Sequence, residues 1–425
     1  MKMIPFWQDT APEFTGAPGA PLPASTDVVV IGGGFNGMSA AYNLAKKGLS
    51  VVLLEKDDIM MGASTRNGGH CNTGVAHNFA VLADKIGIAK ASEAYRAFSS
   101  AVDYVDALVK EENIDCDFRF CGKLKLASKP GHMAGLQRAY DLIRRNVDRE
   151  VALLSRDDLR GEIGSENFHG ALLQKRGGQM HMGKFGIGLA NAAARYGAKI
   201  YANHAVTGLY RLDGHRHQVV TTQGTILAEK VLMATGCSNI GPFPWFKRRI
   251  VPMGSFVIVT APMEKTLLQN VLPKDRTYVT SLNLVNYFRS TADSRLVFGG
   301  RAKFTMSNPI TDPGSGEILR NGLYNMFPQL RDTPIEYCWG GMLDMTADRL
   351  PRSGEHEGVF YSVGHNGHGT QMSTWMGKMM ADYMAENITK SPWERGNWPA
   401  LAAYSGKPWF LPLAGLYYKA KDRIS

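Results

Sequence analysis

The sequence predicts an α/β fold in which a doubly wound domain with a parallel sheet is joined to an α+β domain with an antiparallel sheet. Apolar runs of strand length alternate with helical stretches near residues 27–54 and again near 184–236, which is typical of parallel sheets covered by helices. Between residues 240 and 340 the segments shorten and alternate in polarity, as antiparallel strands do. These observations predict two kinds of sheet in one chain.

Length and composition limit the classes of protein. The chain has 425 residues, of which 44% are apolar and 20% charged, which excludes a disordered tail, a collagen-like repeat and a mini-protein and predicts two to three domains. The 48 Lys and Arg against 38 Asp and Glu give a net charge of +10. Because these cations are scattered, without a block of five or an aromatic-interleaved stripe, we expect no nucleic-acid partner.

Cysteines and apolar runs indicate the compartment. The five cysteines form no CxxC pair, and an odd count argues against a disulfide framework. The first 25 residues lack the apolar core of a secretory signal, and no run reaches the ~18 apolar residues that span a bilayer. We therefore expect a cytoplasmic protein without a transmembrane segment, although contact with a membrane surface stays possible.

The first elements form a βαβ unit. Residues 1–25, rich in Pro, Gly and Ala, predict an extended arm. Residues 27–31 read as a buried strand, 38–47 as a helix that ends at Gly48, and 50–54 as a second strand. A strand, a helix and a strand in so short a stretch predict parallel pairing.

The loop of this unit is a GxGxxG motif, residues 32–37. Gly32 permits the tight turn, Gly34 lets a pyrophosphate approach the backbone, and Gly37 lets the helix pack closely on the strand. Glu55 ends the second strand, 18 residues after Gly37, where a carboxylate can accept hydrogen bonds from both ribose hydroxyls. The motif predicts NAD or FAD and disfavours NADP, whose 2′-phosphate a carboxylate would repel.

Three further segments favour FAD. Residues 62–70 (Gly-Ala-Ser-Thr-Arg-Asn-Gly-Gly-His) follow the second strand and are expected to open a helix, so that Arg66 and the hydroxyls face the pyrophosphate and the ring. Residues 234–236 (Ala-Thr-Gly) form a tight turn after a strand. Residues 364–371 predict a second helix opening, whose dipole can stabilise negative charge at flavin N1 and O2.

The remaining elements are predicted in chain order. Amphipathic stretches at 91–111 and 131–149, around the alternating segment 123–126, suggest an inserted second module. Parallel-sheet character returns with a helix at 184–196 and strands at 197–201 and 230–234. Antiparallel strands are expected at 257–259 and 295–298, and then a strand at 358–363 and a helix at 370–386.

Motifs along the whole chain carry a family resemblance. They are Phe-Trp-Gln-Asp at 6–9, the run 27–37, GASxRNGG at 62–69, Trp-Gly-Gly at 339–341, Asp-Arg-Leu-Pro at 348–351, Gly-His-Gly at 367–369 and Gly-Leu-Tyr-Tyr at 415–418. The chain resembles the FAD-dependent D-amino-acid oxidase superfamily, and within it the bacterial γ-glutamylputrescine and γ-glutamylpolyamine oxidases. The resemblance implies a FAD domain of the glutathione-reductase type (1–90, 150–238 and 342–425). It also implies a substrate domain (91–149 and 239–341) whose antiparallel sheet lies over the flavin.

The resemblance also implies where the cofactor binds. In sarcosine oxidases a cysteine attaches the flavin at the position of Gly341, and in dimethylglycine-type enzymes a histidine does so at the position of Asn67. We therefore expect noncovalent FAD, with His70 and Cys338 as the residues nearest to a flavin-linked role. The expected FAD contacts are Gly32, Gly34, Asn36, Gly37, Glu55, Lys56, Ser64, Thr65, Arg66, Asn67, Gly68, Gly69, His70, Val206, Thr235, Gly236, Gly340, Gly341, Gly367, His368, Gly369, Thr370 and Gln371.

The implied reaction is oxidation of a C–N bond. A neutral amine loses hydride to flavin N5, and water hydrolyses the imine to an aldehyde. The expected substrate is a γ-glutamylated polyamine or alkylamine, and the alternative is a D-amino acid, glycine or an N-methyl amino acid. Reduced flavin passes its electrons to O2 or another acceptor, and no metal site is expected.

Five residues are candidates for substrate contact or charge stabilisation: Tyr287, Arg289, Lys303, Trp339 and His365. Tyr287 and Arg289 are two positions apart and so share one face of a strand. Ordinary alternatives are core packing for the aromatic residues, a surface role for Arg289 and Lys303, and a turn for His365. Residues 243–246 (Phe-Pro-Trp-Phe) could line the entrance of the pocket or an interface.

Overall fold

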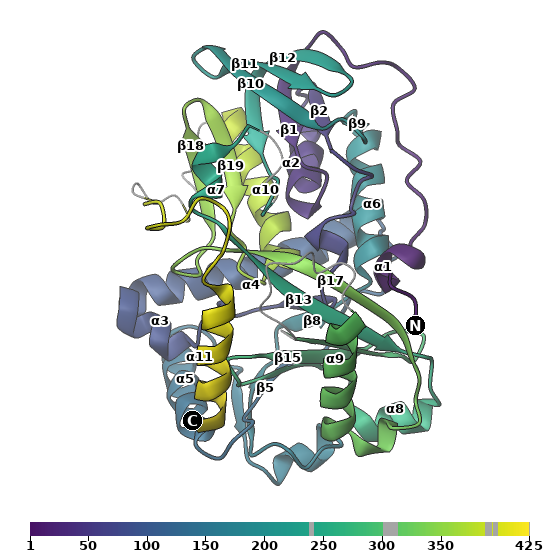
Figure 1. The fold of residues 1–425 in the computed structure, drawn as a ribbon, viewed down its shortest axis with the longest axis vertical. Coiled ribbons are helices and arrows are strands. Elements are labelled where there is room, and N and C mark those ends of the chain that lie inside the picture. Colours follow the sequence, from purple (N-terminus) through teal and green to yellow (C-terminus); the bar gives the residue numbers. More distant parts are fainter. Residues whose placement is uncertain (238–241, 301–312, 387–392, 394–397, 425) are drawn as a thin grey trace.

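The computed structural model describes residues 1–237, 242–300, 313–386, 393 and 398–424. It contains a largely parallel sheet with its helices, drawn in the upper half of Figure 1, and an antiparallel sheet with its own helices, drawn in the lower half. The two kinds of sheet predicted from the sequence are therefore both present.

The parallel sheet is assembled from distant parts of the chain. Its five parallel strands lie in the order β19 (Val359–Val363), β12 (Gly224–Met233), β1 (Ser25–Ile31), β2 (Val51–Leu54) and β9 (Lys199–Tyr201). Along one edge of β12, residues 224–228 pair with β11 (Arg216–Thr221) and residues 231–233 pair with β19. The hairpin of β10 (Val206–Asp213) and β11 and the strand β18 (Arg352–His356) complete this sheet.

Each central strand is apolar on both faces, as a covered parallel sheet requires. Val28 and Val30 of β1 pack on the face that carries the helices, and Val29 and Ile31 pack on the opposite face. The helices are α2 (Phe35–Lys46), α6 (Met182–Arg195) and α10 (Gly369–Glu386), and α10 lies against α2. The predicted strands and helices of this region are confirmed, with shifts of a few residues at their ends.

The second sheet has eight strands. Their order is β17 (Ile335–Met345), β13 (Val251–Thr260), β16 (Leu296–Gly300), β15 (Asn286–Ser290), β14 (Thr277–Thr280), β5 (Lys123–Leu126), β7 (Ala171–Gln174) and β6 (Ala152–Leu154). All neighbours are antiparallel except β14 and β5. Phe256, Phe288 and Phe298 form part of its apolar core together with Leu319 and Leu323 of α9 (Pro313–Met326), the helix that crosses this sheet in Figure 1.

Other elements surround the two sheets. They are the helices α1 (Phe6–Asp9), α3 (Phe79–Ile86), α4 (Ile88–Glu111), α5 (His132–Asn146), α7 (Pro244–Lys247), α8 (Lys265–Val271) and α11 (Leu411–Ile424), and a small sheet of β3 (His70–Asn72), β8 (Gly177–Gln179) and β4 (Arg119–Phe120). In Figure 1 the C-terminal helix α11 lies beside the lower sheet. This placement brings the end of the chain to the antiparallel sheet.

Two findings bear on the expected domain division, which otherwise stays a prediction. Strands β6 and β7 lie within the stretch 150–238 but pair in the antiparallel sheet, because Leu173 of β7 belongs to the same apolar core as Leu124 of β5. The Asp422 carboxylate of α11 accepts hydrogen bonds from the main-chain N–H groups of Asn283 and Leu284 at 2.8 Å. These two segments therefore lie with the antiparallel sheet, not with the parallel one.

Two local expectations are wrong. The first 25 residues are not simply an extended arm, because residues 6–9 form α1 and the indole of Trp7 is buried and donates to the Asn67 carbonyl at 2.7 Å. Residues 62–70 do not open a helix. They form one 3-10 turn (Ala63–Thr65) and then enter β3, because Gly69, with φ of +79°, turns the chain out of helical geometry.

Candidate active site

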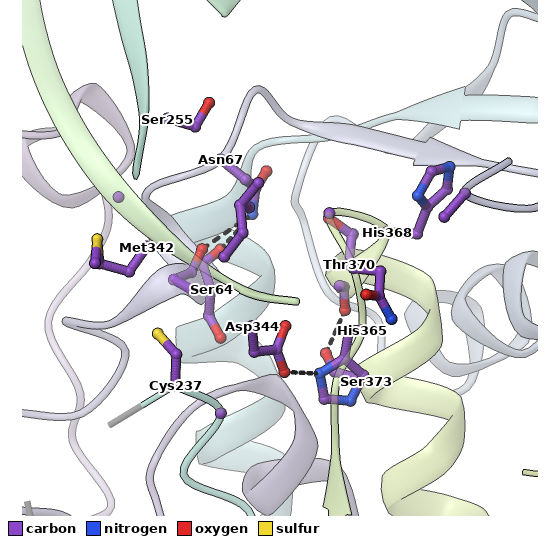
Figure 2. Close-up of a pocket in the computed structure, with 18 of the residues that line it drawn as sticks. Ser64, Asn67, Cys237, Ser255, Met342, Asp344, His365, His368, Thr370 and Ser373 are labelled. Carbon is purple, nitrogen blue, oxygen red and sulfur yellow. Dashed lines mark hydrogen bonds and ion pairs between the residues drawn. The ribbon is translucent and has the colours of Figure 1, made fainter. Parts of the chain in front are cut away.

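A cavity of about 1660 Å³ is lined by residues of both sheets. It is larger than the ~300–1,000 Å³ of a common small-molecule site, so it has room for a dinucleotide and a second molecule. One end is formed by the GxGxxG turn and Glu55, and the other by β5, residues 281–283 and Tyr418. Figure 2 shows the middle of this cavity.

The GxGxxG turn has the geometry that its glycines predict. Gly32 has a φ of +114°, and a Cβ placed on Gly37 would lie 1.9 Å from the Gly32 carbonyl oxygen. Neither position tolerates a side chain. The Glu55 carboxylate accepts the main-chain N–H of Gly33 at 2.6 Å, and burial raises its pKa. The backbone at this end is open to a pyrophosphate, with a carboxylate beside it for the ribose.

The segment 62–70 is tied to the start of α2. The Ser64 hydroxyl accepts the main-chain N–H of Phe35 at 2.9 Å. The Asn67 side chain donates to the Ser64 carbonyl and accepts the N–H of Gly69, both at 2.8 Å, and Figure 2 shows Asn67 turned toward Ser64. Arg66 donates to the Gly340 carbonyl at 3.2 Å, which joins the same segment to β17. The segment is therefore fixed before any ligand binds.

An acid–histidine pair lies at the strand end before α10. Asp344 contacts His365 Nδ1 at 2.9 Å and accepts the N–H of Gly364 at 2.7 Å, and Figure 2 shows the carboxylate pointing at the ring. Burial alone would raise the pKa of Asp344, but the charge and hydrogen bonds of His365, with the N–H of Gly364, hold that pKa below its usual value. His365 Nε2 is buried and has no partner among the described residues.

Two further cavity histidines are half-buried, and one ring nitrogen of each is fully buried. His70 Nε2 and His368 Nδ1 also have no partner in the described part of the chain. Burial, helped by Lys123 and other nearby cations, lowers the pKa of each ring to about 3. Both rings are therefore neutral near pH 7. Buried polar atoms are normally satisfied, so three orphaned ring nitrogens around one cavity fit a polar ligand such as FAD.

Most of the expected cofactor residues line the cavity; their contacts with FAD stay a prediction. Four of them lie behind the wall instead, namely Gly37, Thr65, Gly69 and Gly340. A Cβ placed on Gly316 of α9 would lie 2.8 Å from Cys338 Sγ, so this thiol faces α9 and does not line the cavity. His70 does line it. Noncovalent binding of the flavin stays a prediction.

Some of the expected substrate residues line the cavity and others do not. Tyr287 and His365 line the cavity, and the Tyr287 hydroxyl lies 3.0 Å from Ser255 Oγ. Trp339 does not line it, because its ring is 0% exposed in the apolar core. Lys303 lies outside the described residues. Of residues 243–246, Phe243 lines the cavity, whereas Trp245 stacks on His356.

The surface alternative for Arg289 is wrong, and its substrate contact stays a prediction, although the side chain does not line the cavity. Tyr287 and Arg289 do share a face of β15, toward Gly68 and Gly69. The Arg289 side chain is however only 3% exposed, and it donates to the carbonyls of Gly68, Met180 and Ser290 at 3.1, 2.7 and 2.8 Å. Because these carbonyls need donors, the guanidinium braces the Gly-Gly turn from behind.

Sequence reasoning missed a set of cations in the cavity wall. Lys123 and Lys125 of β5 and Arg349 line it. The alternation Lys-Leu-Lys-Leu at 123–126 identified the strand, and the same alternation places both lysines on one face. The sequence alone could not show that this face of the strand lines the cavity. In the described part of the chain, no group of three or more His, Cys, Asp or Glu side chains could hold a metal ion.

Comparisons with known proteins agree with this geometry. The model of the FAD dependent oxidoreductase family matches residues 27–383. The chain belongs to the FAD dependent oxidoreductase family. Its members' cofactor, FAD, fits the glycine turn, Glu55 and the orphaned histidine nitrogens. Among the described helices of this FAD dependent oxidoreductase, none is long and apolar enough to cross a bilayer.

Individual relatives cover nearly all of this FAD dependent oxidoreductase. The chain is 29% identical over 404 residues to "Gamma-glutamylputrescine oxidoreductase" of Escherichia coli K12, covering 94% of this chain and 93% of that protein. It is 30% identical to "Probable oxidoreductase OrdL" of Rhizobium meliloti, covering 89% and 87%. The crystal structure of glycine oxidase from Geobacillus kaustophilus shares the fold, with a TM-score of 0.73, 22% identity, and 89% and 99% coverage.

Proposed function

We propose that this enzyme oxidises a C–N bond of a γ-glutamylated polyamine or alkylamine to an imine, which water hydrolyses to an aldehyde. The observation that carries this proposal is the similarity to Gamma-glutamylputrescine oxidoreductase of Escherichia coli, which extends over 94% of the chain. Bound FAD would supply the hydride acceptor, and O2 or another oxidant would reoxidise it. The reaction needs no metal ion.

The cavity supports a long substrate. Beyond Tyr287 and His70, where the GASxRNGG segment predicts the flavin ring, the cavity continues along β5 to Ser281, Asn283 and Tyr418. A molecule the size of glycine would leave that extension unused. An extended chain with its reactive amine at one end would place that amine near His70 and fill the extension with the rest.

The chain's own residues would orient the amine and hold it neutral. Only a neutral amine has the lone pair that supports loss of hydride from the neighbouring carbon. Lys123 and the N-terminus of α10 both line this part of the cavity, and their positive potential lowers the pKa of a bound ammonium. The neutral rings of His70 and His368 can accept or donate hydrogen bonds there without adding charge.

Oxidation of an amino acid, as in glycine oxidase, is the second candidate. A "Glycine oxidase" of Geobacillus kaustophilus is 27% identical over 374 residues. That reaction needs a cation close to the reacting carbon for the α-carboxylate, and Arg289 is engaged with three carbonyls. A D-amino acid, glycine or an N-methyl amino acid would therefore have to rely on another group, such as Lys123.

A substrate panel tests the proposal. The FAD-loaded enzyme is mixed without oxygen with γ-glutamylputrescine, putrescine, glycine, sarcosine and D-alanine, and flavin absorbance is followed. We expect γ-glutamylputrescine to bleach the flavin fastest. Bleaching by glycine or D-alanine but not by any γ-glutamyl amine would replace the first candidate with the second. Readmitting oxygen and measuring peroxide then distinguishes an oxidase from a dehydrogenase.

A further inference from the structure

The cations of the cavity wall suggest what the far end of the substrate carries. We propose that Lys125 and Arg349, with Lys123 on the side nearer the amine, form an anion-binding subsite that holds a carboxylate of the substrate, remote from the amine that is oxidised. This inference rests on the proposed function, because it takes the cavity to be the substrate site. Of the three, only Arg349 lies in one of the family motifs, Asp-Arg-Leu-Pro at 348–351, and the sequence assigns it no role.

Lys123 is the innermost of the three. It is 8% exposed, and its Nζ donates to the Thr73 carbonyl at 3.1 Å. The amide of Gln174, on the neighbouring strand β7, lies beside the same ammonium, because a Cβ on Gly74 would meet Gln174 Nε2 at 2.9 Å and Lys123 Nζ at 3.4 Å. An ammonium has three donors, so this one can still donate to an anion.

The three cations have no negative partner in the described part of the chain. No described carboxylate forms an ion pair with Lys123, Lys125 or Arg349, and burial lowers the pKa of both lysines. The acids that line the cavity are placed elsewhere: Asp344 pairs with His365, and Glu55, Asp57 and Asp58 lie at the ribose end. A nearly buried lysine without a counter-ion is rare in proteins, and a bound carboxylate would supply the missing charge.

The backbone of Arg349 has an unusual conformation. Its φ is +54°, a conformation that costs a residue with a side chain free energy that glycine does not lose. The side chain nevertheless lines the cavity. Keeping an arginine at a position suited to glycine is understandable if the guanidinium has a ligand there.

Charge changes along the length of the cavity. Glu55, Asp57 and Asp58 line the ribose end, and Lys85 and Lys421 extend the basic wall to exposed positions at the other end. A free diamine with two ammonium groups is poorly matched to this basic wall. A molecule with an amine at one end and a carboxylate at the other is well matched, and a γ-glutamyl amine has this pattern.

The test uses a matched pair of amines with the FAD-loaded enzyme. N-glutarylputrescine carries a terminal carboxylate, and N-pentanoylputrescine has the same number of carbons without it. For Lys125→Met and Arg349→Gly we expect the preference for the carboxylate-bearing amine, measured as a ratio of kcat/KM values, to fall about tenfold. Lys90→Met removes an exposed charge outside the cavity and should keep the ratio. A ratio unchanged in both cavity variants overturns the subsite.

A binding measurement separates this inference from the proposed function. Glutarate has no amine to oxidise, so its dissociation constant, read from the change in flavin absorbance, reports on the subsite alone. We expect both cavity variants to weaken it, with Arg349→Gly melting no lower than the wild type because glycine suits the backbone. Suppose that no γ-glutamyl amine reduces the flavin but the variants still lose glutarate binding. The proposed function is then wrong, and the anion-binding subsite is supported. Unchanged glutarate binding overturns the subsite whatever the substrate.

Discussion

Arg289 and Trp7 hold the turn that follows the second parallel strand. The guanidinium of Arg289 lies 4.8 Å from the centre of the Trp7 ring and donates to the Gly68 carbonyl, and the Trp7 indole donates to the preceding carbonyl, that of Asn67. A Cβ on Gly69 would lie 2.1 Å from the Arg289 side chain. The glycine pair therefore lets Tyr287 and Arg289 pack directly against the backbone.

Arg289→Met should destabilise the protein and leave substrate discrimination unchanged. Three buried carbonyls lose their donor, each at a cost of about 1–3 kcal/mol. Urea unfolding measures the loss. Arg176→Met removes an exposed pair with Asp103 and should change the free energy of unfolding by less than about 1 kcal/mol. An Arg289→Met protein of normal stability with a raised KM for carboxylate substrates would return Arg289 to the substrate site.

The half-buried cavity histidines His70 and His368 make stability depend on pH. The pKa of His70 and of His368 is about 3 in the folded chain and near 6.5 in the unfolded one. Between these values the unfolded chain binds more protons, so the free energy of unfolding falls as pH falls, by up to about 1.4 kcal/mol per pH unit for each ring. Unfolding measured from pH 6.5 to 5 should show this slope. His368→Asn should reduce it, and an unchanged slope would contradict the assignment.

Elements were predictable where their pattern was long, and not where packing alone defines them. The sequence identified α2, α6, α10 and the central parallel strands because each shows a sustained apolar period. The three-residue strand β6 and the single-turn helix α1 have no period to read. Helix α1 forms where Trp7 packs in an apolar core built from distant segments. Strand β6 forms because it pairs with β7.

The contact between α2 and α10 depends on a glycine. A Cβ on Gly377 of α10 would lie 2.4 Å from the Asn36 carbonyl oxygen and 2.9 Å from the Ala40 nitrogen. Gly377→Ala should therefore force the helices apart, lower stability by about 1–3 kcal/mol and weaken FAD binding. Gly322→Ala on α9, where the nearest atom is 3.7 Å away, should be neutral or stabilising by up to about 1 kcal/mol. Thermal melting with and without added FAD compares the two.

For the whole molecule, the sequence located the cofactor half of the candidate site better than the substrate half. Glu55 and the glycines of 32–37 lie close together in the chain, so their joint role is visible locally. Lys123 and Arg349 are separated by more than 200 residues and meet only because β5 enters the antiparallel sheet. The Asp344–His365 pair was missed because Asp344 lies on β17 of the antiparallel sheet and His365 follows β19 of the parallel sheet, so their contact depends on how the two sheets are placed.

The basic end of the cavity should make anion binding sensitive to salt. The exposed Lys85 and Lys421 act through solvent, where the Debye length shrinks from about 10 Å at 0.1 M salt to about 3 Å at 1 M. The dissociation constant of glutarate should therefore rise between these concentrations. Lys421→Gln should flatten the salt dependence while Lys90→Gln leaves it as it is. A dissociation constant independent of salt would show that Lys85 and Lys421 do not contribute to anion binding.

The interleaved strand order has a consequence during synthesis. The parallel sheet is complete only when β19 pairs with β12, and the helix opening beside the predicted flavin ring belongs to α10, near residue 369 of 425. The ribosome therefore synthesises the GxGxxG turn long before it synthesises the start of α10. Chains that stop before α10 should remain colourless however much FAD is present, so yellow colour on a nascent chain would report that translation has passed this helix.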